Sequence, residues 1–237
     1  MNSGKIQLVC IVAAIVVFFI IIVYAFLKAK KEEKRCKDIE NYCKKNNFKY
    51  FSELNDIPED GKGFSIFNHR GHSARYYAGM VGEQGDNSFQ IFDYYYETGN
   101  VGKNRVTYDF TVCLLSNKKA KMPQFFVRDE DSILDSLGKL FGGQDINFDE
   151  DPVFSPKFIL QGLSEKDIRA FFDDRVRTAF VNNHTVGYVY EGRGDSIMVF
   201  VEGSIDLDLR IKIFTVAKNL MEVIVSKSNT DNTNANS

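Results

Sequence analysis

The chain has 237 residues, of which 44% are apolar and 26% are charged, and its formal net charge is −2. This composition excludes a largely disordered chain, because it provides enough apolar residues for one membrane segment and one or two compact domains. The balanced charge gives no reason to expect a nucleic acid as a partner.

The first expected element is a membrane-spanning helix over residues 6–27, after a short N-terminus of residues 1–5. The run IQLVCIVAAIVVFFIIIVYAFL contains no charged residue. As a helix it would measure about 33 Å, which is enough to cross the hydrocarbon core of a bilayer. A cleavable signal peptide is the main alternative, but the apolar run is longer than such peptides carry and no small-residue cleavage motif follows it. The pattern therefore predicts an uncleaved anchor.

Basic residues gather on the C-terminal side of this run, whereas Lys5 is alone on the N-terminal side. They are Lys28, Lys30, Lys31, Lys34, Arg35 and Lys37. Because basic segments resist translocation, the N-terminus is expected outside and the rest of the chain in the cytoplasm. The lipid bilayer is thus a predicted partner, and these basic residues are expected to touch anionic headgroups. Residues 28–47 have only a narrow apolar stripe, which predicts a solvated extension of the helix.

Residues 48–143 are predicted to form an antiparallel sheet subdomain with a closing helix over residues 131–143. Residues 51–67 are expected to be a connector, and strands are expected at 74–82, 88–97, 104–115 and 123–129, where apolar and polar residues alternate. In the third strand the even-numbered side from Val106 to Leu114 is expected to be buried and the odd-numbered side to be wet. Pairing even with even positions keeps Asp93 from lying opposite Asp109.

Residues 144–226 are predicted to form a second, β-α-β-β-α subdomain. A strand over 157–163 is followed by one helix opened by Ser164, by strands at 184–190 and 196–202, and by a long helix from about 206 to 225. The polar residues 227–237 are expected to be a disordered tail. The predicted fold class is therefore α+β, with an N-terminal transmembrane helix.

The turn TGNVGKN, between the second and third strands, shares glycines and a lysine with the phosphate-binding loop GxxxxGK[ST]. Only two residues separate its glycines, Asn104 replaces the hydroxyl residue, and a strand follows where a helix should begin. The pattern predicts a hairpin turn. Lys103 and Arg105 near its exposed tip are then candidate contacts for an anionic partner.

Two of the three histidines lie close together in FNHRGHSAR, where His69 and His72 could both ligate a metal. Gly71 favours a surface loop instead, and no third ligand stands at a telling spacing. The remaining histidine, His184, is expected at a strand end. The chain has no nucleophile elbow, no HExxH and no dinucleotide glycine pattern. No catalytic residue, metal ligand or cofactor is therefore predicted, and an enzyme is the less favoured interpretation.

The hairpin sequence FDYYYETGNVGKNRVTYDFTV, with MPQFFVRDED, LGKLFGGQDINF and DPVFSPKFIL after it, resembles a bacterial family of small single-pass membrane-anchored proteins of unknown function. Members of that family carry a hairpin of the form FDYxYxTGxGKxRxT. The resemblance covers about residues 74–225. It implies the α+β architecture and a location in the bacterial inner membrane, and it implies no catalytic residues.

Together these features favour a noncatalytic binding or scaffolding module at the membrane, with a protein partner. Two alternatives remain open. One is a metal-dependent enzyme built around His69 and His72. The other is a small-ligand sensor with a pocket between the two subdomains.

Overall fold

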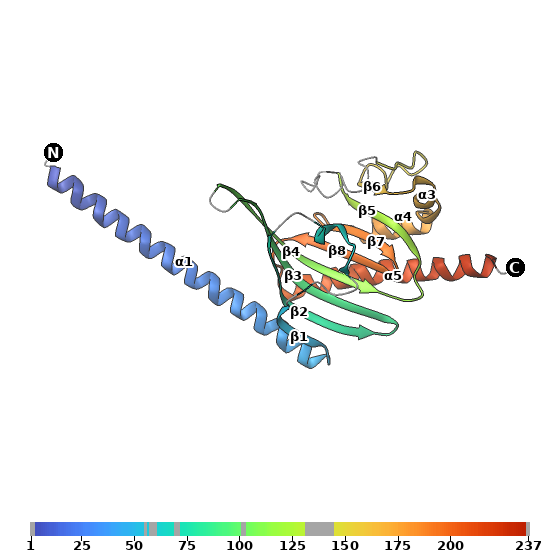
Figure 1. The fold of residues 1–237 in the computed structure, drawn as a ribbon, viewed down its shortest axis with the longest axis horizontal. Helices are drawn as coiled ribbons and strands as arrows, with labels where there is room; N and C mark the ends of the chain where they lie inside the picture. Colours follow the sequence, from blue (N-terminus) through green and yellow to red (C-terminus); the bar gives the residue numbers. More distant parts are fainter. Residues whose placement is uncertain are drawn as a thin grey trace.

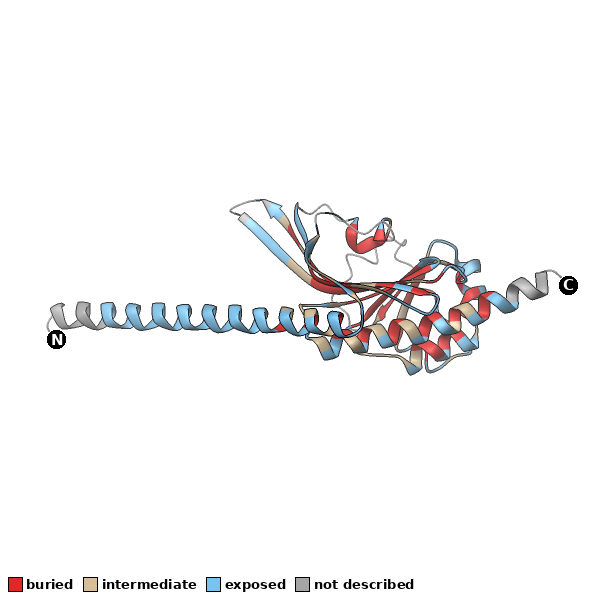
Figure 2. Cartoon of the chain, turned by 90° about the horizontal axis from the view of Figure 1, so that it is seen from below, coloured by how far each residue is buried: buried red, intermediate tan, exposed pale blue. Residues whose placement is uncertain are grey.

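The computed structural model describes residues 3–54, 56, 61–68, 72–100, 103–130 and 145–235. Helix α1, Ser3–Lys45, runs without a break through the apolar segment and the basic residues that follow it. The helix contains a stretch long and apolar enough to cross a membrane, and none of that stretch is buried against the rest of the protein. Figure 2 shows this exposed part of α1 extending away from the folded domain. The predicted N-terminal helix is confirmed.

Eight strands of the described residues form a single sheet, in the order β1-β2-β3-β4-β8-β7-β5-β6 (Figure 1). All neighbouring pairs are antiparallel. The strands are β1 (Lys49–Leu54), β2 (His72–Gln84), β3 (Asn87–Asn100), β4 (Lys103–Ser116), β5 (Met122–Asp129), β6 (Phe158–Gly162), β7 (Val189–Gly194) and β8 (Ser196–Glu202). The helices after the sheet begins are η2 (Ser65–Phe67), α3 (Glu165–Phe171), α4 (Asp174–Asn182) and α5 (Leu207–Ala235). The predicted α+β class is confirmed.

The two expected subdomains share this sheet. Strand β4 pairs directly with β8, from Phe110 opposite Glu202 to Ser116 opposite Ser196. The two expected subdomains are therefore joined by a continuous ladder of backbone hydrogen bonds. The sensor interpretation requires a pocket between them at this place. The closing helix expected at residues 131–143 lies outside the described residues.

Several elements differ in extent from the sequence expectations. Residues 49–54, expected to precede or open a connector, form the edge strand β1, which pairs with β2. The Phe51 ring lies over Gly79, where an added Cβ would be 1.8 Å from Cζ of that ring. The single helix expected after Ser164 is two helices, because the Asp173 side chain accepts the Val176 N–H and so starts a new helix.

At the C-terminus, α5 extends to Ala235 rather than ending near residue 225. Two polar residues just past the expected end are buried and bonded: Ser228 Oγ accepts from Lys121 N at 2.9 Å, and Lys227 Nζ donates to Asp173 at 2.9 Å. The sequence pattern misses this extension because polar side chains, and not apolar ones, attach this turn of the helix.

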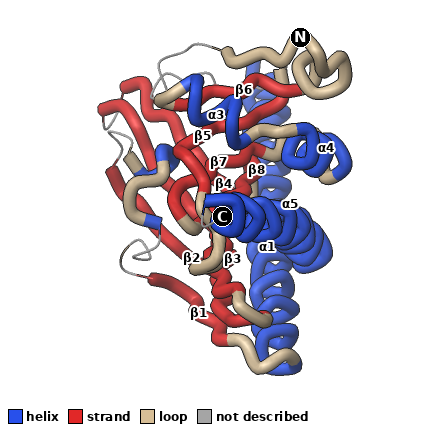
Figure 3. The backbone as a smooth tube through the Cα atoms, turned by 90° about the vertical axis from the view of Figure 1, so that its right-hand side faces the viewer, coloured by secondary structure: helices blue, strands red, loops and turns tan. Residues whose placement is uncertain are grey.

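The four α-helices of the described residues lie against one face of the sheet (Figure 3). The core on this face includes Ile39 of α1, Ile168 of α3, Phe180 of α4 and Leu220 of α5. The odd-numbered side of β3 and β4 forms the floor of this core; Asp93, Thr111, Cys113 and Leu115 are fully buried there. Among the odd-numbered β4 residues expected to be wet, Arg105 to Thr111, the expectation is wrong for Thr111, because helices cover this face of the sheet.

The opposite face carries an aromatic core. It consists of Phe64, Ile66, Phe67, Tyr76, Phe92, Tyr94, Tyr96, Phe110, Val112, Leu114, Phe126, Val189, Met198 and Phe200. The register pairs Phe92 with Val112, Tyr94 with Phe110 and Tyr96 with Tyr108. The predicted even-to-even pairing is confirmed, and Asp93 lies opposite Thr111. Three of the aromatic-core residues belong to the segment 61–68, which crosses this face.

A buried carboxylate fixes that crossing segment to the sheet. Glu191 of β7 is fully buried, and its two carboxylate oxygens accept the Ser65 N–H at 3.0 and 2.9 Å. The Ser65 hydroxyl also donates to Glu191, at 2.6 Å. Burial raises the pKa of Glu191 to about 7, and the hydrogen bonds from Ser65 oppose the rise only in part.

We expect this carboxyl to make stability depend on pH. Its ordinary pKa is 4.5 and its folded pKa is about 7, so between these values the folded state binds a proton that the unfolded state lacks. Stability should fall across that window by about 1.4 kcal/mol per pH unit, roughly 3 kcal/mol in total. Glu191→Gln should remove most of the fall. Urea unfolding of the full chain in mild detergent, followed by tyrosine near-UV circular dichroism at pH 5, 6, 7 and 8, measures this.

Glu202→Gln is the matched control, because Glu202 is an exposed acid on the neighbouring strand β8. Its profile should follow that of the wild type. Parallel profiles for wild type and Glu191→Gln would show that the buried carboxyl does not titrate in this range.

Candidate functional site: the junction of the anchor helix with the sheet

Helix α1 docks on the sheet through its last three turns. Arg35, Ile39 and Cys43 lie four residues apart, so they share one face of the helix, and all three are buried. From Arg35 onward the extension predicted to be solvated therefore has one buried face, while its other faces, with Lys37 and Lys44, stay exposed. Its apolar stripe is narrow, and Ile39 and Cys43 of that stripe are completely covered.

Asp93, at the centre of β3, is the hub of this junction. Its Oδ2 accepts a hydrogen bond from Arg35 Nη2 at 2.6 Å, and its Oδ1 accepts from Thr111 Oγ1 at 2.8 Å. Arg210, in the first turn of α5, also donates to Oδ1 and is fully buried. One carboxylate thus joins α1, the centre of the sheet and α5.

Both arginines also use backbone acceptors. Arg210 Nη1 donates to the Ala78 carbonyl at 2.7 Å, and Arg35 Nη1 donates to the Ile205 carbonyl at 3.0 Å. Ala78 belongs to β2, and Ile205 lies just before α5. The guanidinium groups therefore fill their donor sites with partners from four separate parts of the chain.

The charges of the junction balance. Glu32, one turn before Arg35, pairs with the Arg35 guanidinium, so two cations face two anions. Burial alone would lower the pKa of Arg35, but its hydrogen bond to Glu32 and the charge of Asp93 raise it. The Arg35 hydrogen bond likewise lowers the pKa of Glu32. Burial raises the pKa of Asp93 and lowers that of Arg210, and the charges of the two arginines oppose the shift at Asp93. Each of these four groups has a partner inside the junction, which suits a structural clamp.

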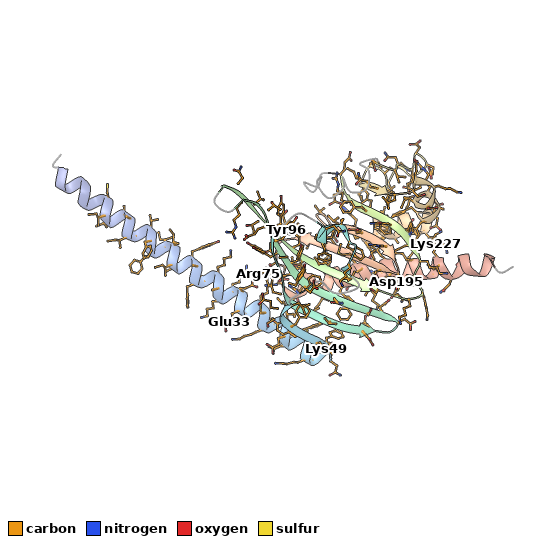
Figure 4. All side chains as sticks on the ribbon, in the orientation of Figure 1. Glu33, Lys49, Arg75, Tyr96, Asp195 and Lys227 are labelled. Atoms are coloured by element: carbon orange, nitrogen blue, oxygen red, sulfur yellow. The ribbon has the colours of Figure 1, made fainter. Side chains whose placement is uncertain are left out.

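Arg35 was expected among the membrane-flanking basic residues, and the structure corrects this. Its guanidinium lies in the protein interior, whereas Lys28, Lys30, Lys31, Lys34 and Lys37 are exposed. Figure 4 places Glu33 on the part of α1 that lies between the apolar stretch and the sheet. Five of the six predicted membrane-flanking basic residues are therefore exposed.

The β3–β4 turn is a hairpin, as predicted. Asn100 pairs with Lys103 across two intervening residues, and β4 follows directly. Without a helix after the turn, the phosphate-loop interpretation has no oriented amides to rest on. The side chain of Lys103 lies outside the described part. Arg105 is exposed and pairs with Glu97, which also accepts from the Tyr95 hydroxyl.

Of the three histidines, only His184 has a described side chain. His69 is outside the described residues, and His72 contributes only its backbone, at the start of β2. His184 lies in the turn before β7, where Nε2 is 2.7 Å from Asp129 Oδ1. Asp129 also accepts the Gly187 N–H at 2.8 Å, so this pair fastens a turn. Within the described ranges, no group of three His, Cys, Asp or Glu residues could hold a metal.

Sequence reasoning missed Asp93, Thr111 and Arg210. A signal did exist: Arg210 stands three residues before Ile213, on the apolar side of α5, and Asp93 interrupts an aromatic strand. Opposite charges on faces that pack together predict an internal ion pair. The pattern could not reveal that α5 and α1 converge on the same carboxylate, because 117 and 58 residues separate the partners.

We expect Asp93→Asn to lower the free energy of unfolding by about 3–5 kcal/mol, since two buried guanidiniums lose their counterion. Arg35→Met should cost less, about 1–3 kcal/mol, because Arg210 and Thr111 still satisfy Asp93 and Glu32 can turn to water. Lys34→Met, at the adjacent exposed position, should change stability by less than about 0.5 kcal/mol. Urea unfolding in detergent measures all three. Equal stability of Arg35→Met and Lys34→Met would mean that the clamp does not hold α1.

Comparison with known proteins adds one fold relationship. No family model and no curated protein matches this sequence. Among solved structures, the fold is similar to that of the mycobacterial trehalose monomycolate transport factor A, TtfA. The TM-score is 0.52 and the sequence identity is 9%, over 80% of this chain and 93% of that chain. At this identity the likeness establishes a shared fold alone.

Proposed function

We propose that this protein is a noncatalytic scaffold anchored in the bacterial inner membrane by α1, which presents its domain to a partner protein on the cytoplasmic side. The domain is held rigidly on α1, close to the membrane surface, and this presentation is its function. The proposal concerns binding, because the charged groups of the buried cluster around Asp93 pair with one another and join α1 to the sheet.

The continuity of α1 is the observation that carries the proposal. The apolar stretch ends at Leu27 and the clamp begins at Arg35, eight residues later in the same helix. Eight helical residues span about 12 Å, so the sheet lies close to the membrane surface. On the other side, Phe48 N donates to the Cys43 carbonyl at 2.9 Å, and β1 begins at Lys49. No flexible linker separates the apolar helix from the sheet, as a mere tether would have.

The similarity to a transport factor supports this class of function. TtfA is named for the transport of trehalose monomycolate. By extension, the partner we propose for this protein is an integral membrane protein whose cytoplasmic surface the domain contacts.

The proposed topology has a direct test. Six basic residues follow the apolar run and Lys5 alone precedes it, which favours the N-terminus outside. Protease added to spheroplasts should leave a C-terminal tag intact, whereas protease added to inverted membrane vesicles should remove it. Carbonate extraction should leave the protein in the membrane pellet. Digestion of the tag in intact spheroplasts would show that the C-terminal domain lies outside, which contradicts the proposed topology.

The scaffold proposal is tested by inserting Gly-Ser-Gly-Ser-Gly-Ser after Lys31, between the apolar run and the clamp. Tagged full-length protein is cross-linked in cells of its own species, solubilised in detergent, purified and quantified by mass spectrometry. We expect wild type to recover a specific integral membrane protein, and the insertion to lower that recovery roughly ten-fold, because a flexible joint lowers the effective concentration of the correctly oriented domain.

The same six residues added after Ser237 are the control and should leave recovery unchanged. Unchanged recovery with the insertion after Lys31 would mean that a simple tether suffices. Recovery of no membrane protein above that of an anchor-only bait would contradict the scaffold proposal itself.

A further inference from the structure

We propose that the β3–β4 hairpin is a second membrane contact, which binds anionic lipid headgroups beside the anchor helix. The inference rests on the proposed anchoring by α1 and goes beyond it, because one helix alone leaves the domain free to rotate about the helix axis. A second contact off that axis fixes the rotation.

The direction of the hairpin is the first observation. Figures 1 and 2, which view the molecule from perpendicular directions, both show β3 and β4 extending beyond the other strands toward the apolar half of α1. The hairpin and the anchor therefore leave the domain on the same side. A membrane crossed by the apolar stretch of α1 lies on that side as well.

The reach of the hairpin is the second observation. Asp93 of β3 contacts Arg35 of α1, so the two elements share a starting level. From Arg35 back to Leu27 the helix covers about 12 Å. From Asp93 to Gly99 the strand covers about 20 Å. Only about three fifths of the strand length has to lie along the helix for Gly99 to reach the level of Leu27, where the apolar run ends.

The charge of this end of the sheet is the third observation. Arg75, on β2 opposite Tyr95, is exposed and has no ion-pair partner among the described residues. Figure 4 shows Arg75 at the end of the sheet that lies toward the apolar part of α1. Lys103 adds a second positive charge in the sequence of the hairpin.

Nearby acids do not cancel these charges. The side chain of Glu97 is 4% exposed and already pairs with Arg105. Asp109, farther down β4, accepts hydrogen bonds from the Tyr77 and Ser204 hydroxyls. On α1, Glu32 and Glu33 pair with Arg35 and Lys37.

Exposed lysines of α1 complete the basic surface. Lys28, Lys30, Lys31 and Lys34 lie on the same stretch of helix that separates the sheet from the apolar run. The hairpin and this stretch of α1 thus present cations to one plane from two separate elements. Each basic residue at an anionic membrane surface strengthens the contact about five-fold at physiological salt.

The test uses full-length protein in nanodiscs that contain either phosphatidylcholine alone or phosphatidylcholine with 30% phosphatidylglycerol. Hydrogen exchange is followed by mass spectrometry in peptides that cover the hairpin. We expect exchange at the hairpin to be at least about five-fold slower in the anionic discs. The difference should disappear in 1 M KCl, which shortens the Debye length to about 3 Å.

Arg75→Glu with Lys103→Glu should abolish the lipid-dependent protection. Arg105 is left in place because Glu97 depends on it. Lys118→Glu with Lys166→Glu is the matched control: it reverses two exposed charges, one in the β4–β5 turn at the opposite end of β4 and one on α3, and it should keep the protection. The salt comparison in wild type supplies a result that does not depend on how the variants fold.

The outcomes separate the two proposals. Co-elution of wild type with the discs and equal exchange in both lipid mixtures would overturn the hairpin contact and leave the anchor intact. Protection that persists in the charge-reversed variant or in 1 M KCl would also overturn it. Failure of wild type to co-elute with any disc would overturn the membrane anchoring on which both proposals rest.

Discussion

The contact of Arg35 and Arg210 with Asp93 is the constraint on which the rest of the structure depends. It joins the helix that leads to the apolar stretch, the central strand β3 and the start of α5 at one carboxylate. A purely apolar contact would allow α1 to slide or rotate on the sheet, because apolar attraction has no direction. Charged hydrogen bonds have defined partners and angles, so they fix one register of the helix.

That register determines the direction in which α1 leaves the sheet relative to the β3–β4 hairpin. The clamp sets where α1 leaves the sheet, and the strand that bears Asp93 continues into the β3–β4 hairpin. Anchor and hairpin are thus positioned by the same residue. The opposite face of the sheet is organised separately, by aromatic packing and by the hydrogen bonds of Glu191 with Ser65. Burial raises the pKa of both carboxyls, and at Asp93 the charges of two arginines oppose the rise.

Local patterns predicted the elements well and their partners poorly. The alternation in residues 88–115 fixed both the strands and their even-to-even register, because a shift by one residue would turn every aromatic side chain to the other face. The same alternation made Asp93 and Thr111 look solvent-exposed. The sequence pattern of a strand is the same whether a polar residue faces water or a buried arginine. Only the helices packed on the sheet determine which of the two it faces.

By itself, the sequence determined the long apolar helix, the basic flank, the α+β class and the hairpin, since each follows from the period or charge of a continuous segment. Only the tertiary structure decided that the two expected subdomains share one sheet through β4 and β8. It alone decided that Arg35 belongs to the protein interior and not to the membrane flank. Both depend on contacts between residues far apart in the chain, which no local pattern encodes.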